Sequence, residues 1–143
     1  MLKRLREKNY YSRIGESYLT DERYLDAQKL TQTESLKRPF RFEIINFLLK
    51  TFKRKTTYLE IGVRNPDDNF NKIRADLKYS VDPCFEFETD FVDFKMTSDE
   101  FFSRLRDGAI LRPAQKFEII FVDGLHLAEQ AERDITNAIG FIS

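Results

Sequence analysis

Three acidic side chains and one histidine stand where an α/β chain would carry its chemistry. Glu60 and Asp82 each end a short apolar run, and Asp123 follows a third run at 117–122. His126, the only histidine in the chain, comes three residues after Asp123. Parallel strands present their carboxyl ends at one edge of a sheet, where α/β proteins bind nucleotide-like ligands. These side chains are therefore expected around one cleft.

The spacing of acids and glycines indicates which ligand that cleft would take. An acid about 20 residues beyond the first loop is placed to accept hydrogen bonds from ribose hydroxyls, which suits NAD or any other adenosine cofactor. A pyrophosphate also requires later glycines, but Gly62 is followed by Arg64 and then by Asp67 and Asp68. Negative charge at that point disfavours phosphates. The loop therefore favours a phosphate-free cationic cofactor such as S-adenosylmethionine, whose methionine end Glu60 would serve.

Each of these residues also has a structural interpretation. Glu60 and Asp82 can cap strand ends or pair with Arg64 and lysines, because ion pairs commonly occupy such positions. Histidine as a residue type titrates near neutral pH, so His126 suits a general base for a hydroxyl nucleophile. Alternatively, Asp123 or His126 caps the helix that follows. A metal site would need a second acid beside Asp123, and the sequence identifies none.

Composition excludes several classes of function. Lys and Arg number 24, as do Asp and Glu, so the net charge is zero, which argues against a general nucleic-acid surface. The single cysteine, Cys84, excludes an intrachain disulfide and a cysteine-based zinc site. No apolar run approaches the ~18 residues of a membrane span. The basic residues 1–6 precede no apolar signal core, so a cytoplasmic location is expected.

Hydrophobic periodicity predicts the elements that hold these residues. A helix is expected within 34–53 with Ile44, Ile45, Leu48 and Leu49 on its apolar face, and strands at 57–61, 79–82, 91–96 and 117–122. Further helices are expected around Phe70 to Leu77, from the capping box at 97–100 to near Gly108, and at 128–139. The last should bury Ala131, Ile135, Ala138 and Ile139. This alternation predicts an α/β fold, a Rossmann-like doubly wound parallel sheet.

The domain plan places this cofactor-binding domain at residues 36–143. Residues 1–35 form an N-terminal helical arm, and the tyrosines at 10, 11, 18 and 24 would suit a lid over the cleft. The sheet contains about four strands, so the fourth strand is an exposed edge. The sequence therefore predicts association into a homodimer across that edge.

Four segments together resemble class I S-adenosylmethionine-dependent methyltransferases. They are residues 59–63 (LEIGV), 80–83 (SVDP), 96–102 (MTSDEFF) and 121–126 (FVDGLH), which occur in the order and spacing of that family. The nearest resemblance is to a small bacterial group with an acid-Gly-x-His segment after the fourth strand. It covers about residues 40–140. The family's sheet has seven strands, so by this resemblance the domain is incomplete at its C-terminus.

The resemblance implies roles for individual residues. Glu60 and Gly62 match the cofactor loop, Asp82 the ribose acid, and Asp123 the acid that closes the cleft. Thr97 and Ser98 match adenine-contacting positions, and His126 matches an active-site histidine. The implied activity is O-methylation of a small-molecule or sugar hydroxyl, without nucleic-acid or membrane partners. The alternative is a non-catalytic or remnant domain that binds a partner or the cofactor without methyl transfer.

Overall fold

The computed structural model describes residues 12–13, 15, 20–85 and 92–143 of the chain. It divides into two compact units, Met1–Phe40 and Arg41–Ser143. Within the first unit, helix α2 spans Glu22–Ser35, and none of its side chains is buried. Of the tyrosines assigned to a lid, those at 10, 11 and 18 lie outside the described residues, so the lid stays a prediction.

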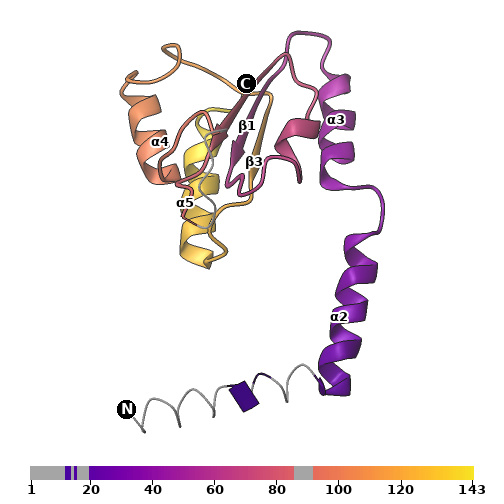
Figure 1. The fold of residues 1–143 in the computed structure, drawn as a ribbon. Helices are drawn as coiled ribbons and strands as arrows, with labels where there is room; N and C mark the ends of the chain where they lie inside the picture. The colour runs from indigo at the N-terminus through magenta and orange to yellow at the C-terminus, as the bar shows by residue number, and fades with distance from the viewer. Residues whose placement is uncertain (1–11, 14, 16–19, 86–91) are drawn as a thin grey trace, which may run out of the picture. The chain divides into compact units, whose positions relative to one another are not determined.

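The second unit is built on a three-stranded parallel sheet in the order β2-β1-β3 (Figure 1). Strand β1 spans Thr57–Ile61, β2 spans Leu77–Val81 and β3 spans Ile119–Val122. The predicted position of Asp123, at the end of a strand beside the first, is therefore confirmed. The α/β class is confirmed as well, with the bounds of β1 as predicted.

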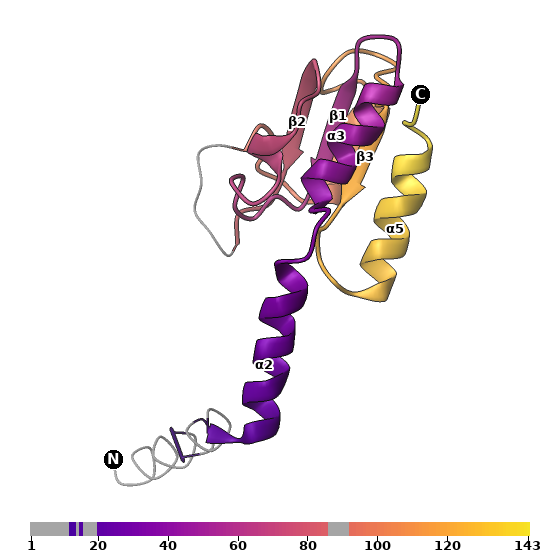
Figure 2. The same cartoon turned by 90° about the vertical axis from the view of Figure 1, so that its right-hand side faces the viewer.

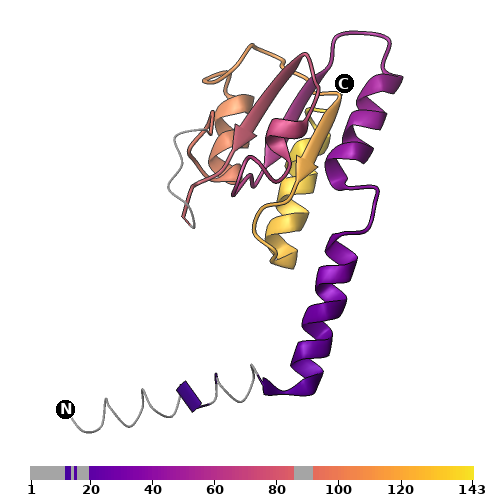
Figure 3. The same ribbon diagram turned by 45° about the vertical axis from the view of Figure 1, so that its right-hand side comes forward.

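Helices cover both faces of this sheet, as Figure 3 shows. Helix α3, Arg41–Thr51, packs Ile45 and Leu49 against one face, in a core that includes Tyr58 of β1. Helices α4, Ser98–Arg106, and α5, Ala128–Ile139, lie on the other face. Their core joins strand residues to both helices and consists of Leu59, Ile61, Val81, Phe101, Phe102, Leu105, Phe117 and Ala138. Strand alternation explains the division, because successive side chains of β1 point to opposite faces.

The prediction of about four strands is wrong for the described residues. Of the expected strand at 91–96, residue 91 lies outside the described residues, and Phe94 makes one isolated bridge to Val81. Asp93 explains the interruption: its carboxylate accepts hydrogen bonds from the backbone amide and the hydroxyl of Ser80, at 2.9 and 2.7 Å. A side-chain carboxylate thus accepts the Ser80 amide, which a backbone carbonyl of a regular neighbouring strand would otherwise accept.

The helix predicted around Phe70 to Leu77 is also wrong. Only a short 3-10 turn, η1, forms at Phe70–Lys72. The chain is then drawn into β2 by bonds to other elements, since the Asn46 side chain binds the carbonyl oxygen of Lys72 and the amide of Arg74. These tertiary contacts override the local apolar spacing.

The two helices after β2 follow their sequence signals. Thr97 caps α4 by accepting a hydrogen bond from the Glu100 amide, as the capping box predicts. The bounds of α5 are as predicted and Ala138 is buried as expected, but Ile135 and Ile139 are not. Asp134 and Ala138 are buried, whereas Ile135 and Ile139 are 52% and 69% exposed. The helix is therefore rotated so that an acid faces inward.

Candidate ligand-binding site

A pocket of about 370 Å³ opens at the carboxyl edge of the sheet, within the size range of small-molecule sites. It lies where β1, β2 and β3 end and where α4 and α5 begin. Six of the seven residues predicted for the site line it: Gly62, Asp82, Thr97, Ser98, Asp123 and His126. The topology therefore brings together segments that are far apart in the chain.

Gly62 is held in the pocket wall by its backbone conformation and by a close neighbour. Its φ is +83°, in the left-handed region. A Cβ at this position would lie 2.5 Å from the Cα atom of Gly124 and 2.6 Å from the carbonyl carbon of Asp123. Any larger residue would push the two loops apart. Gly62 thus serves the packing of the β1 and β3 loops.

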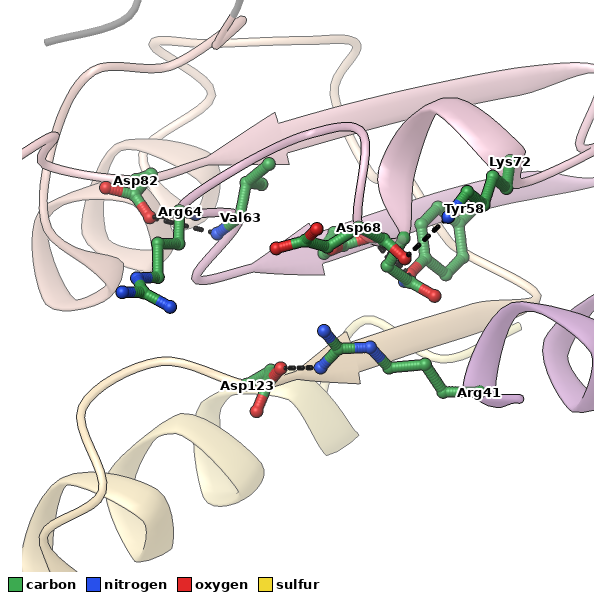
Figure 4. Close-up of polar contacts among 10 residues, drawn as sticks. Arg41, Tyr58, Val63, Arg64, Asp68, Lys72, Asp82 and Asp123 are labelled. Atoms are coloured by element: carbon green, nitrogen blue, oxygen red, sulfur yellow. Dashed lines mark hydrogen bonds and ion pairs between the residues drawn. The ribbon is translucent and has the colours of Figure 1, made fainter. Parts of the chain in front are cut away.

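Asp82 folds the first loop around its own carboxylate. Its Oδ2 atom accepts hydrogen bonds from the backbone amides of Val63 and Arg64, both at 2.9 Å (Figure 4). Its Oδ1 atom accepts one from the amide of Cys84 at 2.6 Å. The structural interpretation of Asp82 therefore holds in part, because its carboxylate stabilises the first loop through these backbone amides.

Asp123 forms an ion pair with Arg41 at the start of α3 (Figure 4). The Arg41 guanidinium also lies 6.0 Å from the ring centroid of Phe121. Both partners are partly exposed, at 46% for the Arg41 side chain and 31% for that of Asp123. One acid of the pocket therefore already has a cationic partner from the opposite face of the sheet.

Glu60 is the one predicted residue that does not line the pocket. It is 2% exposed and lies on the α3 face, where the Tyr58 hydroxyl and the Asn69 amide donate to its Oε2 atom at 2.7 and 2.9 Å. Burial raises the pKa of Glu60, although these two donors and Arg41 oppose the shift. The same burial raises the pKa of Tyr58. Glu60 is therefore part of a buried polar cluster.

Thr97, Ser98 and His126 occupy the rim contributed by the two later helices. Thr97 uses its hydroxyl to cap α4, and the Ser98 hydroxyl accepts a hydrogen bond from Gln130 at 3.2 Å. His126 is exposed and precedes α5. The cap residue of α5 is Leu127, without a side-chain cap bond, so the interpretation of Asp123 or His126 as that cap is wrong. His126 therefore lines the pocket without acting as the cap of α5.

Sequence reasoning missed Arg41, Gln130 and Asp134. Arg41 carried a signal, because a cation in the first turn of a helix opposes the helix dipole. Gln130 and Asp134 are four residues apart on α5, and the Gln130 amide donates to Asp134 at 2.9 Å. That spacing places both on one helix face.

Across the residues that the structure describes, no group of three or more His, Cys, Asp or Glu side chains could hold a metal ion. None of the described helices is both long and apolar enough to span a membrane. Comparison with protein-family models, with curated proteins and with solved structures finds no match to this chain.

Proposed function

We propose that the chain is a class I S-adenosylmethionine-dependent methyltransferase with a Rossmann-like fold, acting on a hydroxyl of a small molecule or sugar. The observation that carries the proposal is the charge of the pocket. Four aspartates line it, Asp82, Asp99, Asp123 and Asp134, against the single arginine Arg64 and His126. Excess carboxylate at the carboxyl edge of a parallel sheet suits a cationic, nucleoside-type ligand.

The first loop supports this choice over a dinucleotide. A pyrophosphate site uses loop amides as anion donors. Here the Val63 and Arg64 amides donate to Asp82, at 2.9 Å each. An added phosphate would have to compete with that carboxylate and be repelled by it. The chain is therefore proposed not to be an NAD-dependent enzyme.

The donor set fits S-adenosylmethionine, which when bound supplies an electrophilic methyl group. Asp82 would face its ribose, and Thr97 and Ser98 would line the end that receives adenine, as the sequence resemblance implies. His126 would accept the proton of the acceptor hydroxyl, because a neutral imidazole nitrogen at the pocket mouth can act as general base. The pocket walls would orient the acceptor, and orientation is the main source of rate in such a transfer.

Calorimetry with S-adenosylhomocysteine tests the binding half of the proposal. The wild-type chain should bind at micromolar to millimolar concentration, and Asp82→Ala should weaken binding. Absence of binding at millimolar ligand, with no difference between wild type and variant, would overturn the proposal. A methyl-transfer assay over small hydroxyl acceptors tests the other half, with His126→Gln as the variant that should lose transfer while keeping cofactor affinity.

A second candidate is a non-catalytic domain of the same fold, and one observation favours it. Asp82 and Thr97 both have structural duties, in the first loop and in the α4 cap. These structural roles would maintain the shape of the pocket even in a domain that catalyses no reaction. Binding of S-adenosylhomocysteine with no transfer to any acceptor, and no effect of His126→Gln, would select this second candidate.

A further inference from the structure

Asp134 is a buried acid whose carboxylate reaches the pocket wall. It stands in the middle of α5, is 1% exposed and lines the pocket. A Cβ on Gly124 would lie 3.6 Å from its Oδ2 atom. That oxygen is therefore next to the crossing of the β1 and β3 loops, where Gly62 and Gly124 meet.

The protein gives this carboxylate little compensation for its burial. Gln130 donates to the Oδ1 atom at 2.9 Å, and the same amide nitrogen also lies 3.2 Å from the Ser98 hydroxyl and 3.5 Å from an Asp99 oxygen. Within the described part of the chain, no further hydrogen bond or ion pair reaches Asp134. A buried carboxyl group with one shared neutral donor is unusual, since buried polar atoms normally have their own hydrogen-bond partners.

The other acids of the pocket are already engaged. Asp82 accepts from three backbone amides, and Asp123 pairs with Arg41. Asp99 is half-exposed and lies 3.7 Å from the Arg133 guanidinium. Asp134 is thus the pocket acid that combines a buried side chain with an oxygen, Oδ2, that is free of protein partners in the described residues and lies next to the loop crossing.

We propose that Asp134 binds an ammonium group of the ligand that occupies this pocket. An ammonium supplies the positive charge and the N–H donor that Oδ2 lacks. A guanidinium would engage two carboxylate oxygens in parallel, but Oδ1 is taken by Gln130. The identification of that ammonium with the amino group of S-adenosylmethionine rests on the proposed function.

Two nucleosides that differ in the ammonium test the assignment. S-adenosylhomocysteine carries an ammonium, and 5′-methylthioadenosine lacks the whole amino-acid end. Asp134→Asn retains an acceptor for Gln130. It should weaken the binding of S-adenosylhomocysteine by at least about tenfold and that of 5′-methylthioadenosine by less than about twofold. Asp99→Asn removes one charge from the same pocket and should weaken S-adenosylhomocysteine less. The unfolding midpoint of Asp134→Asn should equal or exceed that of wild type.

A purely structural Asp134 gives a different result. The variant would then unfold at a lower temperature and weaken both nucleosides alike, which would overturn the assignment. A cofactor-free arm uses n-butylammonium and n-butanol as probes of the ¹⁵N-labelled chain. Butylammonium should shift the Gly124 and Asp134 amide signals in wild type but not in Asp134→Asn, and butanol should shift neither.

The two arms separate the two proposals. If butylammonium shifts these signals but S-adenosylhomocysteine does not bind, the ammonium site stands and the methyltransferase proposal fails. If butylammonium leaves the signals unchanged, the ammonium site is refuted even where S-adenosylhomocysteine binds.

Discussion

The backbones of Gly62 and Asp123 lie so close that a Cβ on Gly62 would come within 2.6 Å of the Asp123 carbonyl carbon. This approach joins the loop after β1 to the loop after β3. The amide of Asp123 also donates to the carbonyl oxygen of Ile61 at 2.8 Å. The two loops therefore form one rigid wall of the pocket, and its shape depends on the absence of a side chain.

Gly62→Ala should destabilise the fold strongly. The variant would combine a left-handed backbone, at about 1–2 kcal/mol, with overpacking against backbone atoms, at about 1–3 kcal/mol. Gly108→Ala is the matched control, because Gly108 has a φ of +67° but no atom within 4 Å of its virtual Cβ. Urea denaturation should give a clearly larger loss for Gly62→Ala. Equal losses in the two variants would mean that the close approach of the two loops adds nothing to the loss of unfolding free energy.

Asp82→Ala should loosen the first loop before it unfolds the protein. Three backbone amides lose their acceptor, and the bonds from Val63 and Cys84 are partly buried. A lost acceptor of this kind costs about 1–3 kcal/mol. Asp82→Asn should lose less, because its amide oxygen still accepts. Hydrogen exchange of the Val63 and Arg64 amides should accelerate in the order wild type, Asn, Ala, and unchanged exchange would contradict the role assigned to Asp82.

Stability should depend on pH through Glu60. Burial raises the pKa of this carboxyl above its ordinary 4.5, so the folded state holds the proton more tightly than the unfolded chain. The resulting stability is fully present below 4.5 and is lost as the pH rises through the folded pKa. Glu60→Gln keeps the shape without the charge. Its unfolding free energy should therefore exceed that of wild type by a margin that grows from pH 4.5 upward.

Asp76→Asn provides a control of opposite sign. Hydrogen bonds from the backbone amide and hydroxyl of Thr56 lower the pKa of Asp76 below its ordinary 3.8. Its contribution is present above that value and is lost as the pH falls through the folded pKa. The variant should lose stability at neutral pH and converge on wild type in acid. A neutral-pH gain for Asp76→Asn, or a loss for Glu60→Gln, would contradict these directions.

Hydrophobic periodicity correctly predicted the elements that local sequence determines. Strand β1 and helix α5 have the predicted bounds because both are apolar at the spacing of their own element. The predicted helix after the first loop failed because Asn46, far away in the chain, holds residues 72 and 74. No local pattern reports such a bond.

The site residues show the same division. Six of the predicted residues line one pocket because parallel strands align their carboxyl ends. Glu60 does not, and strand alternation already places it on one face with Tyr58, away from Leu59 and Ile61. That signal was available in the sequence. Asp134 was not predictable in the same way, because a single acid on an amphipathic helix becomes buried only through the packing of α5 on the sheet.

Strand β3 leaves one edge of the sheet open among the described residues. Only Phe117, just before the strand, pairs outward, in a bridge to Ile142. Helix α3 turns Asn46 towards residues 72 and 74, which lead into β2. Its opposite flank, with Ile44 and Leu48, therefore lies on the side of β3, and these side chains are 46% and 45% exposed.

Helix α5 lies beside the same open edge, on the other face of the sheet (Figure 2). Its flank towards α4 carries Gln130, Arg133 and Asn137, which contact Ser98, Asp99 and Arg106. The flank that carries Ile135 and Ile139 points the other way, past β3. An open strand edge between two apolar helix flanks is a surface that a second sheet edge would cover.

The predicted homodimer follows if a second copy covers this surface. A two-fold axis would pair the two β3 edges antiparallel and bring each apolar flank against the same flank of the second copy. Leu48→Lys should then shift the sedimentation coefficient from dimer to monomer, because two ammonium groups would meet near the axis. Leu77→Lys is the matched control, since Leu77 is 49% exposed on β2 at the opposite edge. The homodimer prediction would be contradicted if the wild-type chain sedimented as a monomer at high micromolar concentration. Equal effects of the two variants would contradict it as well.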